Sequence, residues 1–141
     1  MPTLFPPEKL RKYPHLMVSD VAIWERYLDK FADFWDAFEY DVRVGEGITP
    51  DPSHPDYMQK MAIALTEKRI DVVAHKGTLS TLIEVKPSAM LSAIGQIISY
   101  QILYEERYPL KGPVKMMLIT DRAGPDLANL CRKFGISLVV V

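Results

Sequence analysis

Two apolar segments on either side of a glycine constrain the fold of this chain most. Residues 69–75 (RIDVVAH) and 79–86 (LSTLIEVK) are rich in β-branched side chains, which favour strands. Lys76 and Gly77 lie between the two segments, and glycine readily adopts the positive φ of a tight turn. The pattern therefore predicts a β-hairpin.

The position of the turn predicts how the two strands pair. We expect His75 to lie opposite Thr78, and this register places Asp71 opposite Leu82. Each strand then has one face for polar side chains and one for the core, because successive side chains alternate between faces.

Three charged side chains share one face of the expected hairpin, those of Asp71, Glu84 and Lys86. The other face receives apolar side chains that can pack on a core: Ile70, Val72, Leu79, Ile83 and Val85. Two carboxylates and an ammonium group therefore converge on a sheet that is otherwise apolar.

This arrangement resembles the D…ExK signature of the PD-(D/E)XK nuclease superfamily, with Asp71 followed by Glu84-Val85-Lys86. Ile70 stands where the proline of the family name would be. The resemblance covers about residues 69 to 120 by motif and implies a metal-dependent nuclease. It also implies a fold: an α/β, restriction-endonuclease-like three-layer αβββαβ core, with a mixed sheet flanked by helices and an extra C-terminal helix and strand.

A second motif follows on the next expected helix. Gln96 and Tyr100 are similar to the QxxxY motif of the RecB-type exonuclease and type I restriction branches. Their spacing of four residues places them on one stripe of a helix. The resemblance implies that they contact the DNA backbone or orient the catalytic lysine, whereas a buried helix with a polar rim is the plainer alternative.

The resemblance assigns a role to each site residue. Asp71, Glu84 and the Val85 carbonyl would bind Mg²⁺ or Mn²⁺, since hard cations take oxygen ligands. Lys86 would orient the attacking water and stabilise charge on the phosphate. The sequence leaves open whether Glu25 or Glu46 adds a further metal ligand.

A plainer interpretation of the charged residues is an ordinary surface. Glu84 would then form an exposed ion pair with Arg69 across the hairpin, and such pairs contribute well under about 1 kcal/mol. The three histidines have no metal-ligand spacing and fit surface or loop positions. Trp24 and Trp35 are expected in the core, and Cys131 as a small buried side chain.

Composition agrees with a single domain in a reducing compartment. The chain has 141 residues, enough for a core without disulfides. A single cysteine excludes a disulfide within the chain and a cysteine-rich zinc site. No 18-residue apolar run is present, so we expect a cytoplasmic protein that does not enter membranes. The net charge of −1 means that nucleic-acid binding needs a local basic patch.

We expect an extended, proline-rich N-terminal arm over residues 1–18 and one domain over residues 19–141. Ser19 and Ser88 are expected to cap the first and the longest helix. The expected elements are helices at 20–34, 56–65, 88–107 and 125–134, strands at 38–44, 69–75, 79–86, 114–120 and 136–141, and a long surface loop at 45–56.

These observations together predict a Mg²⁺-dependent deoxyribonuclease that hydrolyses DNA phosphodiester bonds. The lack of a recognition module favours structure-selective or weakly sequence-specific activity, in DNA processing, recombination, restriction or mobile-element and phage biology. A homodimer would supply the second site needed to cut both strands. Endonuclease or exonuclease activity, and RNA as a substrate, stay open. The alternative is a noncatalytic nucleic-acid-binding or assembly module that retains the fold.

Overall fold

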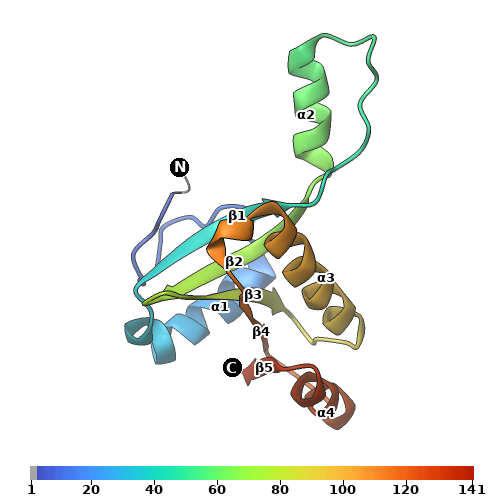
Figure 1. Cartoon of the computed structure of the whole chain (residues 1–141). Coiled ribbons are helices and arrows are strands. Elements are labelled where there is room, and N and C mark those ends of the chain that lie inside the picture. Colours follow the sequence, from blue (N-terminus) through green and yellow to red (C-terminus); the bar gives the residue numbers. More distant parts are fainter. Residues whose placement is uncertain (1–2) are drawn as a thin grey trace.

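The computed structural model describes residues 3–141, in which a five-stranded mixed sheet is flanked by helices (Figure 1). The elements in chain order are α1 (Val18–Phe31), a 3₁₀ turn η1 (Ala32–Phe34), β1 (Ala37–Val44), α2 (Asp56–Thr66), β2 (Lys68–Lys76), β3 (Leu79–Lys86), α3 (Ser92–Arg107), a 3₁₀ turn η2 (Pro109–Lys111), β4 (Lys115–Thr120), α4 (Pro125–Lys133) and β5 (Ile136–Val140).

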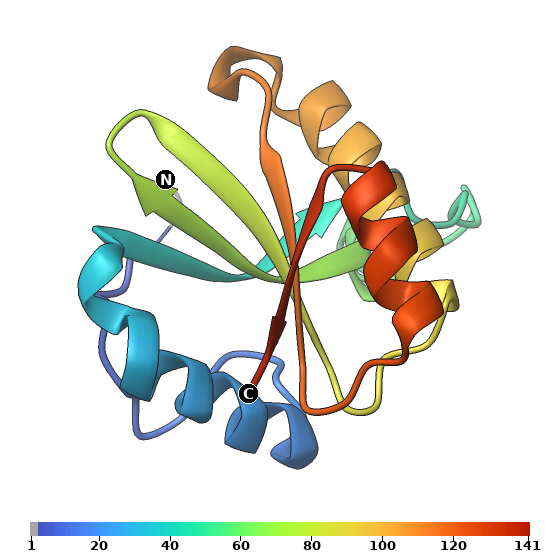
Figure 2. The same cartoon turned by 90° about the horizontal axis from the view of Figure 1, so that it is seen from below.

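The strands lie in the order β1-β2-β3-β4-β5. β1, β2 and β3 form an antiparallel meander, whereas β4 and β5 continue the sheet in parallel with β3. α1 covers one face, and α3 and α4 cover the other (Figure 2). The expected three-layer αβββαβ core with an added C-terminal helix and strand is therefore confirmed.

An aromatic cluster between α1 and the sheet is the largest of the clusters that form the core. Trp24 is fully buried against Phe38 and Tyr40, and its indole Nε1 donates a hydrogen bond of 3.1 Å to the Tyr40 hydroxyl. Trp35 likewise donates to the Tyr27 hydroxyl at 2.9 Å. The polar tips of these buried rings are thus satisfied inside the core, as burial requires. Both tryptophans occupy the core positions expected from the sequence.

In β1 and β2, the alternation of side chains between the two faces of the sheet is interrupted near residues 41 and 71. On the N-terminal half of β1, Phe38 packs in the α1 cluster, whereas Val42 packs in the cluster under α3. Asp41, between them, adopts a left-handed φ of 56°, which interrupts the alternation. On β2, Val72 faces α1 but Ile70 packs with the α3 cluster. The expectation that Ile70 shares a face with Val72 was wrong for this reason.

Neither serine caps the helix that was expected to follow it. α1 starts at Val18, and the carbonyl of Met17 accepts the first helical hydrogen bond, so Ser19 lies inside the helix. α3 starts at Ser92, four residues after the expected cap. Ser88 instead has a left-handed φ of 43° and donates its N–H to Asp121 at 2.7 Å. This bond ties the segment to the end of β4, a long-range contact that local propensity does not reveal.

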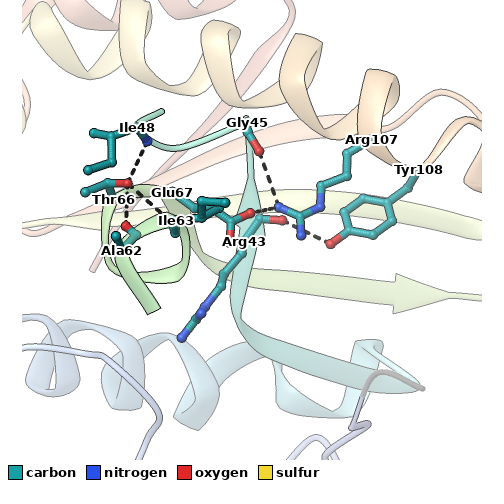
Figure 3. A network of polar contacts seen from close by, with 9 residues as sticks. All are labelled: Arg43, Gly45, Ile48, Ala62, Ile63, Thr66, Glu67, Arg107 and Tyr108. Carbon is teal, nitrogen blue, oxygen red and sulfur yellow. Dashed lines mark hydrogen bonds and ion pairs between the residues drawn. The ribbon is translucent and has the colours of Figure 1, made fainter. Parts of the chain in front are cut away.

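Helix α2 projects from the body together with the loop that precedes it (Figure 1), and none of its side chains is buried. Its base is fixed by polar contacts (Figure 3). The Thr66 hydroxyl accepts the Ile48 N–H at 2.8 Å, and Arg107 at the end of α3 forms an ion pair with Glu67. Tyr108 donates to the Arg43 carbonyl at 3.0 Å. The α2 arm, which consists of α2 and the loop before it, is thus held at its base, while its tip makes no contact with the sheet.

The segment before α1 runs along the molecule without regular helix. Phe5 exchanges two backbone hydrogen bonds with Phe38 on β1, at 2.8 and 2.9 Å, and Tyr13 is buried in the aromatic cluster. The first two residues of the expected arm lie outside the described part of the chain. Within residues 3–141 no helix has the length and apolar character needed to cross a bilayer.

Candidate active site

The β2–β3 hairpin has a different register from the one expected, yet it brings the same residues together. Lys76 pairs with Leu79, and Gly77 in the two-residue turn has a φ of 58°. Leu82 therefore lies opposite Val73 rather than Asp71. The shift is by two residues, so the parity of the strands and the faces of the charged residues are preserved.

Beyond the last backbone pair of the hairpin, hydrogen bonds to side-chain carboxylates take the place of backbone hydrogen bonds between β2 and β3. The same register would place Asp71 level with Glu84. Here the Asp71 N–H donates to Glu84 Oε1 at 3.3 Å, and the Val85 N–H donates to Asp71 Oδ2 at 3.0 Å. Each carboxylate thus binds a backbone N–H of the neighbouring strand. The two carboxylates are thus held between β2 and β3, each by a backbone N–H of the other strand.

Burial makes this carboxylate pair electrostatically unfavourable when both groups are charged. Glu84 is 3% exposed, and desolvation followed by the charge of Asp71 raises its pKa to about 9. Desolvation also raises the pKa of Asp71, to about 6, and the charge of Asp20 adds to the effect. The Lys86 ammonium opposes both shifts without cancelling them. The pair therefore retains a proton at neutral pH unless another positive charge is present.

Gln96 and Tyr100 lie together at the same site, on the stripe of α3 that faces it. The Gln96 side-chain amide donates to the Tyr100 hydroxyl at 3.0 Å. Burial raises the pKa of Tyr100, and the charges of Glu84 and Asp71 raise it further, so the hydroxyl stays protonated. The Tyr100 hydroxyl is therefore a polar group within electrostatic reach of both carboxylates.

A cleft of about 380 Å³ opens over these groups. It is lined by all five side chains expected at the site and by the Val85 backbone position, with further residues from α1, β2 and the segment before α1: Asp71, Glu84, Val85, Lys86, Gln96, Tyr100, His15, Asp20, Lys68 and Arg69. The structure thus gathers the whole predicted set from β2, β3 and α3 around one concavity.

Asp20 is the carboxylate of α1 that sequence reasoning missed. It lies in the first turn of the helix and lines the cleft. Glu25, the expected candidate on α1, instead accepts a hydrogen bond of 2.9 Å from Tyr13, away from the cleft. Glu46 lines a different hollow beside Leu103 at the end of β1. The signal for Asp20 was its place at the helix start, since first-turn side chains point toward the preceding loop.

Arg69 and His15 form the basic wall of the cleft. Arg69 Nη1 lies 3.0 Å from His15 Nδ1, and Arg69 Nε lies 3.7 Å from Asp41. The alternative in which Arg69 forms a surface ion pair with Glu84 is therefore wrong. Arg69 contacts Asp41 on β1, whereas the Glu84 carboxylate is buried and accepts the N–H of Asp71.

The donor set suits a hard cation in composition. Within residues 3–141, no three His, Cys, Asp or Glu side chains lie close enough to hold a metal by themselves. Two carboxylates and a backbone carbonyl would supply part of the coordination shell, and Mg²⁺ commonly keeps several waters for the rest. The desolvation and mutual repulsion of Asp71 and Glu84, when both are ionised, are what a bound divalent cation would relieve.

Comparisons with known proteins add little to this picture. No family model and no curated protein matches the chain. A match among solved structures is the crystal structure of AF1548, a protein of unknown function, with 17% identity and a TM-score of 0.48. The match covers 72% of this chain and 47% of the other, so the chain spans about half the length of that protein.

Proposed function

We propose that this protein is a Mg²⁺-dependent deoxyribonuclease of the PD-(D/E)XK type, which hydrolyses DNA phosphodiester bonds at the Asp71–Glu84–Lys86 cleft. The observation that carries the proposal is the buried carboxylate pair beside a lysine in an open cleft. A structural ion pair would match each carboxylate with a cation, whereas here two buried carboxylates lie together and either keep a proton or need a bound cation to be ionised at the same time.

In this proposal Asp71, Glu84 and the Val85 carbonyl hold the metal. The bound ion would supply charge neutralisation at the phosphate and a more acidic water. Burial of the pair supports that role, because carboxylates held by backbone N–H groups need little reorganisation to accept a cation. Mn²⁺ would serve as well, since it takes the same oxygen ligands.

Lys86 would position the nucleophile and stabilise charge on the scissile phosphate. It follows Glu84 by two residues on β3, so both side chains lie on one face of the strand and line the same cleft. Tyr100, held by Gln96, would donate its hydroxyl proton in a hydrogen bond to the DNA backbone.

Arg69, Lys68 and His15 would receive the phosphate backbone along the wall of the cleft. The overall charge of the chain is close to zero, so this local patch is what makes binding of a polyanion plausible. In this proposal the activity is structure-selective or weakly sequence-specific, because contacts to the phosphate backbone carry no sequence information directly. We place this activity in the cytoplasm, because a chain with a single cysteine needs no disulfide.

The test is incubation of the protein with closed circular, linear and four-way-junction DNA, in Mg²⁺, Mn²⁺ or EDTA. Glu84→Ala and Lys86→Ala are the site variants, and Glu46→Gln, outside the cleft, is the matched control. We expect metal-dependent cleavage that both site variants abolish and the control retains. A parallel reaction with single-stranded RNA shows whether the substrate is DNA or RNA, and cleavage of the closed circle identifies an endonuclease.

If the wild type cleaves none of the substrates and calorimetry detects no Mg²⁺ binding, the nuclease proposal is overturned. A noncatalytic nucleic-acid-binding or assembly module would then be the better account. Cleavage that Lys86→Ala leaves at the wild-type rate would refute the role given to the lysine.

A further inference from the structure

β5 is an edge strand with an open row of hydrogen-bonding groups. It ends the sheet, and the Val141 N–H donates to the Thr120 carbonyl on β4 at 2.9 Å. In a parallel ladder alternate residues bond to the same neighbour. The N–H and C=O groups of Leu138 and Val140 therefore face away from β4, where no strand of the described residues 3–141 pairs with them.

The sequence of β5 lacks the features that usually protect an edge. Natural edge strands are blunted by charged side chains, prolines or bulges. β5 reads ISLVV, with no charge and no proline, and Val140 is 52% exposed. The opposite edge differs, because the Phe5 segment pairs with Phe38 and covers part of β1. β5 is thus the edge of this sheet that is ready to accept another strand.

A hollow adjoins β5 on each face of the sheet. On the α1 face, a groove of about 310 Å³ is lined by Ser137 and Val139 together with aromatic side chains such as Phe31 and Phe34, both partly exposed. On the α4 face, a second hollow is lined by Ile136, Ser137 and Leu138 together with residues of α4. Figure 2 shows β5 running between α1 and α4. An added strand would therefore place its alternate side chains over two different hollows.

The charges beside this edge select the kind of strand that fits. Lys76 and Lys115 line the groove on the α1 face, and Arg132 lines the hollow on the α4 face. No acidic residue lines either hollow. Lys76 lies 3.9 Å from Asp36, whereas Lys115 and Arg132 have no ion pair within residues 3–141. The edge is apolar at its centre and basic at its rim.

We propose that β5 is a docking edge for an extended, acidic segment of a partner protein, which adds a strand to the sheet. Its large apolar side chains would enter the aromatic groove beside Phe31 and Phe34 on one face, and its carboxylates would meet Arg132 on the other. A second copy of this chain fits less well, because two-fold pairing of β5 would bring the cations of both copies together. The proposal does not depend on the nuclease activity.

Strand addition is tested with a fluorescein-labelled hexapeptide of alternating Glu and Phe, measured by anisotropy. The controls are the same peptide with Lys in place of Glu, and one with proline at its third position, which cannot complete a ladder. We expect the Glu–Phe peptide alone to bind, with an affinity that falls as salt is raised. Equal binding of the Lys–Phe peptide would overturn the charge argument, and no binding of the Glu–Phe peptide would overturn the proposal.

Two variants distinguish binding at the β5 edge from nonspecific binding of the peptide. Val140→Pro removes one outward N–H without removing a bond to β4, with Val140→Thr as the matched control. Arg132→Glu reverses one exposed charge and leaves β5 intact, so it keeps the test valid if the proline variant misfolds.

We expect Val140→Pro to weaken binding of the Glu–Phe peptide at least tenfold and Val140→Thr to leave it unchanged. Arg132→Glu should weaken the Glu–Phe peptide several-fold and strengthen the Lys–Phe peptide. Wild-type affinity in both Val140→Pro and Arg132→Glu would refute the site. A wild-type dimer in sedimentation analysis that Val140→Pro converts to a monomer would show that a second copy occupies the edge, contrary to the proposal.

Discussion

Replacing Glu84 by glutamine should remove a pH-dependent loss of stability that arises at the candidate active site. Desolvation and Asp71 raise the pKa of Glu84 to about 9, from 4.5 for an exposed glutamate. Because the folded-state pKa is raised, the stabilising effect of the bound proton is fully present below the unfolded pKa. It is lost as the pH rises toward the folded pKa. Asp71, with a pKa raised to about 6, contributes little further change above pH 6.

The magnitude follows from one proton held by the folded state alone. Each pH unit in the window costs about 1.4 kcal/mol per proton, so from pH 6 to 8 the free energy of unfolding of the wild type should fall by about 3 kcal/mol relative to Glu84→Gln. For a domain of this size, this difference corresponds to a change in Tm of about 6–12 °C.

The assay is urea unfolding of both proteins at pH 6 and pH 8 in EDTA. Taking the difference between the free energies of unfolding of the two proteins cancels the contributions of groups that titrate in both. Free energies of unfolding that change in parallel, within about 0.5 kcal/mol, would refute the reasoning. They would mean that Glu84 is hydrated in solution or paired with a cation that the described contacts do not include.

Three further predictions test other parts of the structure. Mg²⁺ should raise the Tm of the wild type more at pH 8 than at pH 6, because the metal displaces the proton on Glu84, and an equal rise at both pH values would contradict this. Tyr40→Phe should lower the free energy of unfolding by about 1–3 kcal/mol in urea titrations, since it leaves the buried Trp24 Nε1 without an acceptor. An unchanged value would mean that water replaces the hydroxyl. Gly47→Ala should loosen the α2 arm in hydrogen exchange, because Gly47 has a φ of 73° and an added Cβ would lie 2.7 Å from the Ile63 carbonyl oxygen. Unchanged protection would refute this.

The hairpin shows how far the sequence predicts the candidate site. Alternation along the strands placed Asp71, Glu84 and Lys86 on one side, and the two-residue error in register left their faces unchanged. The register itself could not be predicted, because a two-residue turn at Gly77 and Thr78 and a slightly displaced one both accommodate the same glycine.

Long-range contacts account for what the sequence did not reveal. Serine is a residue type that commonly caps helices, but the N–H of Ser88 donates to Asp121, far along the chain. The helix therefore begins only at Ser92. Asp20 joins the cleft only because α1 begins beside the ends of β2 and β3. The left-handed conformation of Asp41 was not predicted because the residue lies within an alternating strand pattern, although aspartate is one of the residue types that adopt it.

The proposed nuclease activity requires that the carboxylate pair binds a metal ion. The rate of DNA strand cleavage, measured as a function of Mg²⁺ concentration, tests this requirement. Wild type should be compared with Glu84→Gln, which preserves the shape of the side chain, and with Glu25→Gln, which alters a carboxylate outside the cleft. We predict a rate that saturates with Mg²⁺ in the wild type and in Glu25→Gln, and a rate at least about 100-fold lower in Glu84→Gln. Cleavage that persists in EDTA, or that Glu84→Gln leaves unchanged, would contradict the claim.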